Sequence, residues 1–343
     1  MLSSRTGTIL KSIVEKYITG AAPVPSQNIA SDTGFKVSPA TIRNEMAYLE
    51  HEGYIIRPHT SAGSIPSDKG YRYYVESLEK AKLSAEQQFF INHLFHQVER
   101  EVEKWRSLAA TLLSQLVQNV AVVSTSRPAH CKFKHMEMVS LQDSVVLLVL
   151  VLMGAKVKQK LINFDQALSQ LRLTAIANKL NAEYSGLTSQ QILAKNIEFS
   201  HTEQQITEYT VEVMRAEDEQ EPEEPYLDGL YFILNQPEFA RNDRLRNLIE
   251  LVEHRNLLKV IMPTGLSGDE VQVVIGEENK AEAIRNYSVV ISQYGLPDGA
   301  TGTIGVVGPT RMPYAHTIPS VGYLSTVLSE LMARLYGKET PPD

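Results

Sequence analysis

The side chains in this sequence that are best suited to chemistry are a guanidinium and an amide on neighbouring residues, Arg43 and Asn44. Arginine can bond guanine, and asparagine can bond adenine, through two hydrogen bonds at once. The small residues Ala40 and Ala47 lie close by, so a helix carrying all four could enter the major groove without bulk holding it off. The pattern predicts recognition of DNA bases. The residues expected at the DNA in this segment are Ser38, Thr41, Arg43, Asn44 and Tyr48.

A second group of hydrogen-bond donors and cations follows in a segment rich in Gly, Pro, Ser and Thr. Such side chains suit phosphate oxygens or a minor groove, and these contacts position a protein on DNA more than they specify sequence. We expect them to act as the second part of a DNA-binding surface. The group consists of Arg57, His59, Thr60, Ser61, Lys69 and Arg72.

Other kinds of chemistry have weaker support. The glycines between Gly302 and Thr310 lack the Lys-Ser/Thr pair of a phosphate-binding loop, so we expect a tight strand-to-loop bend there, with Arg311 in a structural ion pair. No nucleophile has a base at a recognisable spacing. Two groups of residues fall short of the ligand count of a structural zinc site: His93 with His96, and His130 with Cys131 and His135. We therefore expect no enzymatic activity, no cofactor and no metal.

Three short helices are predicted to position the first group. Apolar residues recur at three- and four-residue steps over 5–17, and a second helix follows over 26–34 with Ser26 as its N-cap. The third helix, over 38–53, has Ser38 as N-cap and proline at its first position. Three short helices joined by tight turns are typical of a helix-turn-helix.

The third helix has two distinct faces. Ile42, Met46 and Leu49 fall in one narrow stripe on a helical wheel, so they are expected to pack against the first two helices. Asn44 and Tyr48 lie on the opposite side. This predicts that the face carrying the amide points outward, where it can reach a base edge.

A β-hairpin is predicted after the third helix. Two runs rich in β-formers, Tyr54 to Arg57 and Tyr71 to Val75, flank a loop of Gly, Pro, Ser and Thr. This would be the wing of a winged helix-turn-helix over residues 1–78, and it would carry the second group of residues.

Charge and composition agree with DNA contact at the N-terminus only. Residues 1–80 carry nine Lys/Arg against eight Asp/Glu, whereas the remainder has a net charge of −8 and would repel a duplex. The longest apolar stretch, Val145 to Met153, is too short to cross a bilayer, and no basic-then-apolar leader opens the chain. One cysteine cannot form an internal disulfide. We expect a cytoplasmic protein with no membrane partner.

The rest of the chain predicts an α+β body. After Ser84, helical spacing of apolar residues continues for over thirty residues, and this long helix would pack either on its twin in a dimer or on its own sheet. Strand-like runs follow at Lys132–Ser140, Val145–Met153 and Lys156–Phe164, and again at Val271–Ile275, Ser288–Tyr294 and Thr303–Val307, before a C-terminal helix from about Ile318 to Tyr336. Between the two sets lie helical runs at Leu168–Leu180, Ser189–Lys195 and Thr202–Arg215, then an acidic run, Glu217 to Pro225, which we expect to be a solvated loop. The economical interpretation is one α+β domain that contains an insertion.

Several segments resemble the HrcA family of heat-inducible transcription repressors. The resemblance is carried by Ser-Pro-Ala-Thr-Ile-Arg-Asn-Glu-Met from Ser38 and by Pro-His-Thr-Ser-Ala-Gly-Ser-Ile-Pro-Ser-Asp-Lys-Gly-Tyr-Arg from Pro58, and it continues at Leu234–Phe239, Gly276–Asn279 and Gly305–Met312. It implies a homodimer that binds an inverted-repeat operator in double-stranded DNA upstream of chaperone operons, and dependence on a GroEL-type chaperonin that heat-damaged proteins compete for. One departure is Ser64, where the resemblance leads us to expect arginine and hence a stronger phosphate contact.

The resemblance also names the domains. The predicted winged helix-turn-helix over 1–78 is followed by an α+β domain over 128–164 and 256–343, which the resemblance names as GAF-like, and by an insertion over 165–255, which it names as a dimerising domain. The long linking or dimer helix over 79–127 is assigned to the GAF-like domain. An alternative stays open at this stage, in which the GAF-like domain binds a small metabolite and makes the protein a ligand-gated winged-helix regulator.

Overall fold

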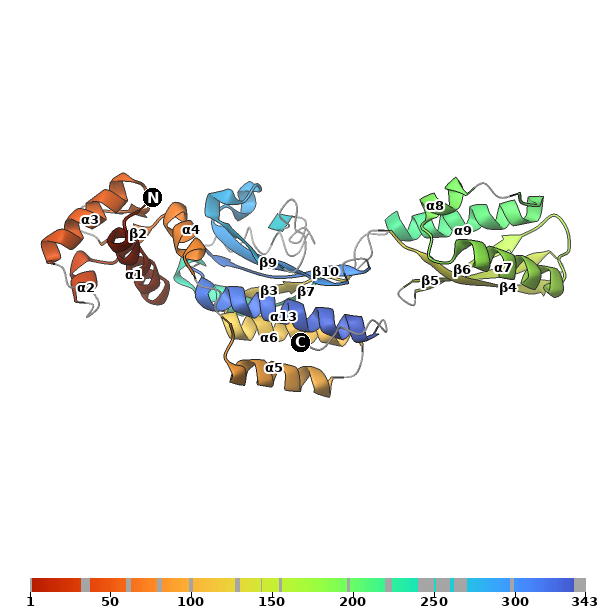
Figure 1. Cartoon of the computed structure of the whole chain (residues 1–343), viewed down its shortest axis with the longest axis horizontal. Coiled ribbons are helices and arrows are strands. Elements are labelled where there is room, and N and C mark those ends of the chain that lie inside the picture. Colours follow the sequence, from red (N-terminus) through yellow and green to blue (C-terminus); the bar gives the residue numbers. More distant parts are fainter. Residues whose placement is uncertain are drawn as a thin grey trace. The chain divides into compact units, whose positions relative to one another are not determined.

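The computed structural model (Figure 1) describes residues 2–31, 38–59, 63–78, 82–98, 101–126, 130–142, 144–153, 156–195, 198–219, 224–239, 250, 260–261, 270–296 and 299–335. The chain divides into two units. The first contains Met1–Ser126, Glu224–Pro297 and Thr301–Asp343, and the second contains Arg127–Glu223 with Asp298–Ala300. The second unit is therefore inserted in the first.

The N-terminal part of the first unit, residues 2–78, contains the three predicted helices. They are α1 (Ser4–Gly20), α2 (Ser26–Ala30) and α3 (Pro39–His51). The hydroxyls of Ser3 and Ser38 accept a hydrogen bond from the first turn of α1 and α3, which satisfies an amide that the helix itself leaves without a partner. The helices are followed by a short antiparallel pair, β1 (Ile55–Ile56) with β2 (Ile65–Pro66).

The second strand predicted for the wing is wrong. Tyr71 to Val75 lie in a helix, α4 (Asp68–Glu76), which Ser67 caps and which has Asp68 in its first turn. The aromatic residues that suggested a strand lie on one helical face instead, since Tyr71 and Tyr74 are both buried. The strand that pairs with β1 is the shorter β2, which ends before α4 begins.

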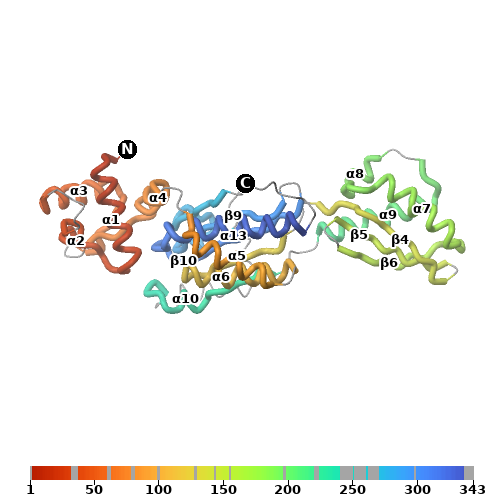
Figure 2. Tube along the Cα trace, turned by 60° about the horizontal axis from the view of Figure 1, so that its bottom comes forward, coloured from red at the N-terminus to blue at the C-terminus, as the bar shows by residue number. Residues whose placement is uncertain are grey.

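The remainder of the first unit, which we call the body (82–126, 224–296 and 301–335), is built on a five-stranded antiparallel sheet. Its strands, in spatial order, are β7 (Tyr226–Asp228), β3 (Val120–Val123), β10 (Thr301–Pro309), β9 (Tyr287–Gly295) and β8 (Gln272–Ile275). The helices α6 (Val102–Val117) and α13 (Tyr314–Leu335) pack on the sheet, and α5 (Ala85–Gln97) contacts both helices (Figures 1 and 2). The short α10 (Leu230–Leu234) and the turn Pro237–Phe239 follow β7. The predicted mixed α+β fold is confirmed.

The single long helix predicted after Ser84 is wrong. Val98 ends α5 in an extended conformation, with φ −86° and ψ 139°, and Glu101 is extended again before α6 begins. The break falls where the apolar spacing slips out of heptad register, between Val98 and Val102. The two halves form separate helices: α6 packs on the sheet, and α5 contacts α6 and α13.

The second unit has its own three-stranded antiparallel sheet of β4 (Phe133–Gln142), β5 (Val145–Leu152) and β6 (Val157–Asn163). The core lies between one face of this sheet and the helices α7 (Gln170–Tyr184), α8 (Ser189–Ala194) and α9 (His201–Glu219). The helices were predicted correctly. Placing 128–164 in one domain with the C-terminal strands is wrong, because β4 to β6 pair only with one another among the described strands.

The acidic run that follows α9 begins inside the fold. Glu217 is buried and its carboxylate binds Lys156 at 2.7 Å and Lys158 at 2.6 Å. Hydrogen bonds and charge from these lysines outweigh the effect of burial and lower the pKa of Glu217. The prediction of a solvated loop is therefore wrong for Glu217, while residues 220–223 lie outside the described part of the chain.

The residues considered for other chemistry interact with other groups of the protein. Cys131 is buried, donates to the carbonyl of Met214 at 3.3 Å, and has its pKa raised by burial to about 12. Arg311 forms an ion pair with Glu238, as predicted, although the glycines before it lie in the strand β10 and not in a bend. Among the described residues, no group of three or more His, Cys, Asp or Glu could hold a metal ion. No helix in the described ranges is long and apolar enough to span a bilayer.

Candidate DNA interface

The two faces of α3 lie as the sequence predicted. Ile42 and Leu49 are 0% exposed and Met46 is 3% exposed, so the apolar stripe is fully packed inside the domain. Arg43 and Asn44 lie on the solvent side. The predicted orientation of the two faces of α3 is thus confirmed. The other exposed side chains of this face are Ala40, Ala47, Tyr48 and His51.

The first turn of α3 is fixed by its own polar residues. The Ser38 hydroxyl accepts from the Thr41 amide at 3.2 Å and lies 3.0 Å from the Thr41 hydroxyl. Both residues were predicted to contact DNA, and the structure gives them a capping role as well. Because the cap holds the first turn, Arg43 and Asn44 in the next turn are presented on a rigid helix.

An ion-pair network holds α3 against α1. Glu45 accepts from Arg5 at 2.8 Å and from the Thr6 hydroxyl at 2.7 Å, and Thr6 in turn lies 2.6 Å from the hydroxyl of the cap residue Ser3. The hydrogen bond from Thr6 is the largest cause of a lowered pKa of Glu45. The charged carboxylate therefore stabilises the packing of the recognition helix on its support.

Glu45→Gln is expected to lower the free energy of unfolding by about 1–2 kcal/mol at neutral pH, since a charge-assisted hydrogen bond from Thr6 and an ion pair with the solvent-exposed Arg5 are lost. Because the pKa of Glu45 is lowered in the folded state, its contribution is fully present above the ordinary carboxyl pKa and is lost as the pH falls through the folded value. The difference between wild type and variant should therefore shrink as the pH is lowered from 6 to 3. Urea unfolding across this range measures it. Glu15→Gln, at an exposed position of α1, is the control. A difference in the free energy of unfolding between wild type and Glu45→Gln that stays constant with pH would contradict this account.

The wing is short and is anchored at its base. Val24, in the linker between α1 and α2, forms an isolated antiparallel bridge with Ser64. The Ser64 side chain is buried, so this position does not face solvent, and the phosphate contact considered there is not supported. Arg57 and His59 are exposed, with Arg57 bound to Glu50 of α3 at 3.0 Å. Thr60 and Ser61 lie outside the described residues.

Two cations assigned to the wing belong to α4. Lys69 is exposed, donates to the carbonyl of Glu52 at 2.7 Å and lies 4.2 Å from the centre of the Tyr54 ring, so it sits beside the end of α3. Arg72 is half-buried, and its guanidinium binds the Glu278 carboxylate and the carbonyl of Val273. The Nε and Nη2 donors of Arg72 are thus used within the protein, so the structure gives Arg72 an internal role and we do not include it in the proposed DNA surface.

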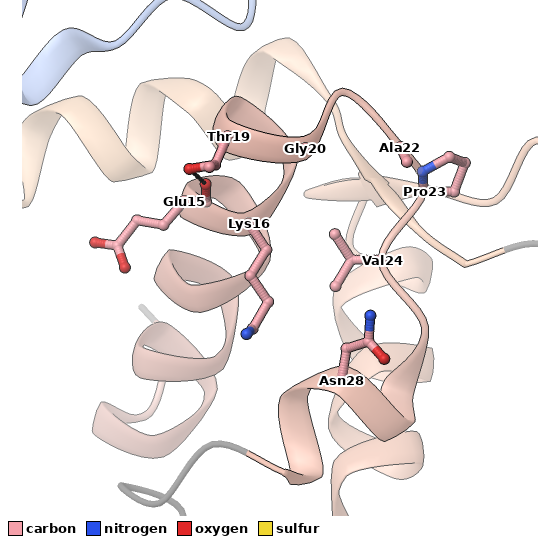
Figure 3. Close-up of a pocket in the computed structure, with 8 residues that line it drawn as sticks. All are labelled: Glu15, Lys16, Thr19, Gly20, Ala22, Pro23, Val24 and Asn28. Atoms are coloured by element: carbon pink, nitrogen blue, oxygen red, sulfur yellow. Dashed lines mark hydrogen bonds between the residues drawn. The ribbon is translucent and has the colours of Figure 1, made fainter.

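A pocket that the sequence did not suggest lies between α1 and α2. It has a volume of about 430 Å³ and is lined by Glu15, Lys16, Thr19, Gly20, Ala22, Pro23, Val24 and Asn28. Figure 3 shows Lys16 from α1 and Asn28 from α2 beside this space, with Thr19 turned back to the carbonyl of Glu15 at 2.9 Å. The residues come from two helices and the linker between them, a combination for which the sequence gives no periodic signal.

Comparison with known proteins identifies a helix-turn-helix over the segment that contains α3 and a family that covers most of the chain. A family model described as the HrcA protein C-terminal domain matches residues 103–318, and a DeoR-like helix-turn-helix model matches residues 33–68. The heat-inducible transcription repressor HrcA of Dehalococcoides mccartyi is 53% identical over 338 residues, covering 98% of both chains. That of Roseiflexus castenholzii is 39% identical, covering 98% of this chain and 96% of its own.

One solved structure shares the fold over nearly the whole chain. It is described as a hypothetical protein at 2.2 Å resolution, with 25% sequence identity and a TM-score of 0.59, covering 97% of this chain and 98% of its own. The family model covers more than half of the residues, and the relatives extend over nearly all of them. The chain belongs to the HrcA family of heat-inducible transcription repressors.

Proposed function

We propose that this chain represses transcription by inserting α3 into the major groove of an operator. The observation that carries the proposal is the division of α3 into a buried apolar face and an outward face with Asn44, Arg43 and two alanines. A narrow helix of this kind can approach base edges, and its amide and guanidinium can each make paired hydrogen bonds there. Packing on α1 and α2 would keep the helix rigid while it does so.

The residues of this surface would have two roles. Thr41, Arg43, Asn44 and Tyr48 would face the bases, because they lie on the first turns and the outer face of α3. Phosphate contacts would surround them and fix the register of the domain on the duplex. The phosphate contacts would come from Ser38, Arg57, His59 and Lys69, together with Thr60 and Ser61.

We further propose that two copies pair through the open face of the sheet in the second unit. Val139, Leu147 and Leu161 form a continuous row across its three strands, and Val151 and Val157 form a parallel one. Leu161 is 63%, Val157 54% and Val139 43% exposed in the single chain. Glu137, Val149 and Gln159 lie between the two rows, so the face combines exposed apolar rows with polar residues, as interaction surfaces often do. A second copy is the occupant that suits an inverted-repeat operator, since two-fold symmetry in the protein matches two-fold symmetry in the DNA.

Heat would relieve repression by lowering the amount of active dimer. The relatives are described as heat-inducible, and the family resemblance implies that a GroEL-type chaperonin maintains the active form. In this proposal the operators lie upstream of chaperone operons, so loss of free chaperonin would raise chaperonin synthesis.

Footprinting on the chaperone promoters of the source genome tests the proposed function. We expect protection of two half-sites related by an inverted repeat, with centres about 10–10.5 base pairs apart or a multiple of that spacing. Protection should persist in excess random DNA. Binding that random DNA competes away as well as the promoter does would overturn sequence-specific repression, and protection of a single asymmetric site would overturn the dimer.

A further inference from the structure

Three segments of the body that carry the family resemblance take part in its contact with the helix-turn-helix domain (residues 2–78). They are Leu234–Phe239, Gly276–Asn279 and Gly305–Met312. Glu278 and Arg311 bind the domain directly, and Glu238 takes part by binding Arg311. None of these segments is used by the proposed DNA surface. Their contact with this domain therefore points to a role other than DNA binding.

The first part of the contact is made by one face of α4. Arg72 donates to Glu278 from Nε at 2.7 Å and again from Nη2, and Nη2 also donates to the carbonyl of Val273 at 2.7 Å. One turn earlier, the Asp68 carboxylate accepts from the backbone amide of Glu277 at 2.9 Å. Two residues spaced four apart on a helix point the same way, so both bind the same turn of the body.

The turn that binds α4 is also held by hydrogen bonds within the body. Glu278 also accepts from the Ile275 amide at 2.8 Å, and the Asn279 side chain donates to the carbonyls of Gly276 and Tyr287, each at 2.9 Å. Gly276 has φ +52°, and a Cβ there would overlap the Asp68 carboxylate. Glycine is needed at this position both for the backbone conformation and for the approach of α4.

The second part of the contact lies at the end of α1. Arg311 donates from Nη1 to the carbonyl of Ile18 at 3.1 Å, while Glu238 binds the same guanidinium from the other side. The last turn of α1 has no basic residue of its own. A cation from the body therefore occupies the negative end of this helix, where it is favourable.

An aromatic contact lies between these two anchors. Tyr71 of α4 is 2% exposed and Tyr314 of the body is fully buried, with their ring centres 6.0 Å apart. The Tyr314 hydroxyl is held by Ser288 at 2.6 Å and by the carbonyl of Thr310 at 2.7 Å. Two polar anchors on different helices with an apolar contact between them resist rotation better than any one of them alone.

We propose that Arg72–Glu278, Asp68–Glu277 and Arg311–Glu238–Ile18 form a clasp that fixes the orientation of the helix-turn-helix domain on the body. Resting on the proposed function, the clasp fixes the direction of α3 relative to the body, so the two α3 helices of a dimer cannot turn independently of the bodies that carry them, and this restricts the half-site spacing. Arg72, Glu278 and Arg311 are positioning residues: they touch no DNA and act through the placement of α3.

Hydrogen exchange tests the clasp without DNA. Arg72→Met keeps the length of the side chain, and Glu278→Gln keeps an acceptor for Ile275, so each removes the ion pair with little change elsewhere. We expect exchange of the Glu277 amide and of α4 to rise by at least about tenfold in both variants, while α3 and the second unit stay unchanged. Glu282→Gln, on an exposed residue nearby, should have no effect. Unchanged exchange at Glu277 in both variants would overturn the clasp, and unchanged protection of the second unit shows that the variants are folded.

Operator spacing tests the consequence. Inserting five base pairs between the half-sites turns one by about half a helical turn, so a rigid dimer should lose about 100-fold in affinity. The clasp variants, with Arg311→Met at the second anchor, should lose about tenfold or less, and their affinity for an isolated half-site should stay within about twofold of wild type. Clasp variants that discriminate spacing as wild type does would overturn this role. If wild type binds no operator at all, the proposed function fails, and exchange at Glu277 still decides whether the clasp exists.

Discussion

Replacing Asn44 with alanine is expected to weaken operator binding by about 1–3 kcal/mol, because a side chain that can make paired hydrogen bonds with a base is removed. Arg43→Ala should cause a loss of similar size. Both side chains are exposed and the packing stripe of Ile42, Met46 and Leu49 is untouched, so the fold should be preserved. Fluorescence anisotropy with operator and random DNA at one salt concentration measures both affinities.

The comparison of the affinity losses on operator and random DNA shows whether Asn44 contacts a base. Binding to random DNA depends chiefly on phosphate contacts and should stay nearly constant for Asn44→Ala. Asn178→Ala, on an exposed asparagine of α7, is a matched control that should change neither affinity. Equal losses on operator and random DNA would show that Asn44 does not read a base.

Leu161→Asp is expected to dissociate the dimer. Leu161 lies opposite Leu147 on the open face of the sheet and is 63% exposed in the single chain, so the fold of the second unit should tolerate the change. In a two-fold interface the substitution occurs twice, and each copy would forfeit about 1.5–3 kcal/mol of apolar burial and place a carboxylate among apolar side chains. The dissociation constant of the dimer should rise by more than about 100-fold, which sedimentation velocity over a concentration series measures.

Operator binding should follow the loss of the dimer. A monomer has only one recognition helix, so its affinity for the full operator should fall to that for an isolated half-site. Leu171→Asp is the matched control, since Leu171 is 84% exposed on α7 and lies off the open sheet face. A Leu161→Asp variant that sediments as a stable dimer would mean that another surface forms the interface.

Features that depend on local sequence were predictable. The caps of α1 and α3, the proline that opens α3 and the stripe of Ile42, Met46 and Leu49 all act within a few residues, so the helix and its outward face follow from the amino-acid sequence alone. The three helices of the second unit were found for the same reason. The comparisons with known repressors then agreed with the segments that carried the resemblance.

Features that depend on residues far apart in the sequence could not be predicted. Tyr71 to Val75 have the composition of a strand, but burial of Tyr71 against Tyr314 favours a helix at this position. Strands β4 to β6 gave correct individual predictions, yet their sequence does not tell which sheet they join. Arg72 was assigned to DNA because its partner, Glu278, lies 206 residues away in the chain.

The central claim, that the outward face of α3 enters the major groove, is tested most directly by cleavage of the operator from that face. Ala47→Cys introduces an exposed thiol beside Asn44, and an iron chelate can be attached to it selectively because Cys131 is buried, with its pKa raised to about 12. We predict hydroxyl-radical cleavage within both half-sites, symmetric about the operator centre, and none from a chelate attached through Leu171→Cys. Absence of cleavage within the half-sites from a labelled protein that still binds the operator would contradict the account.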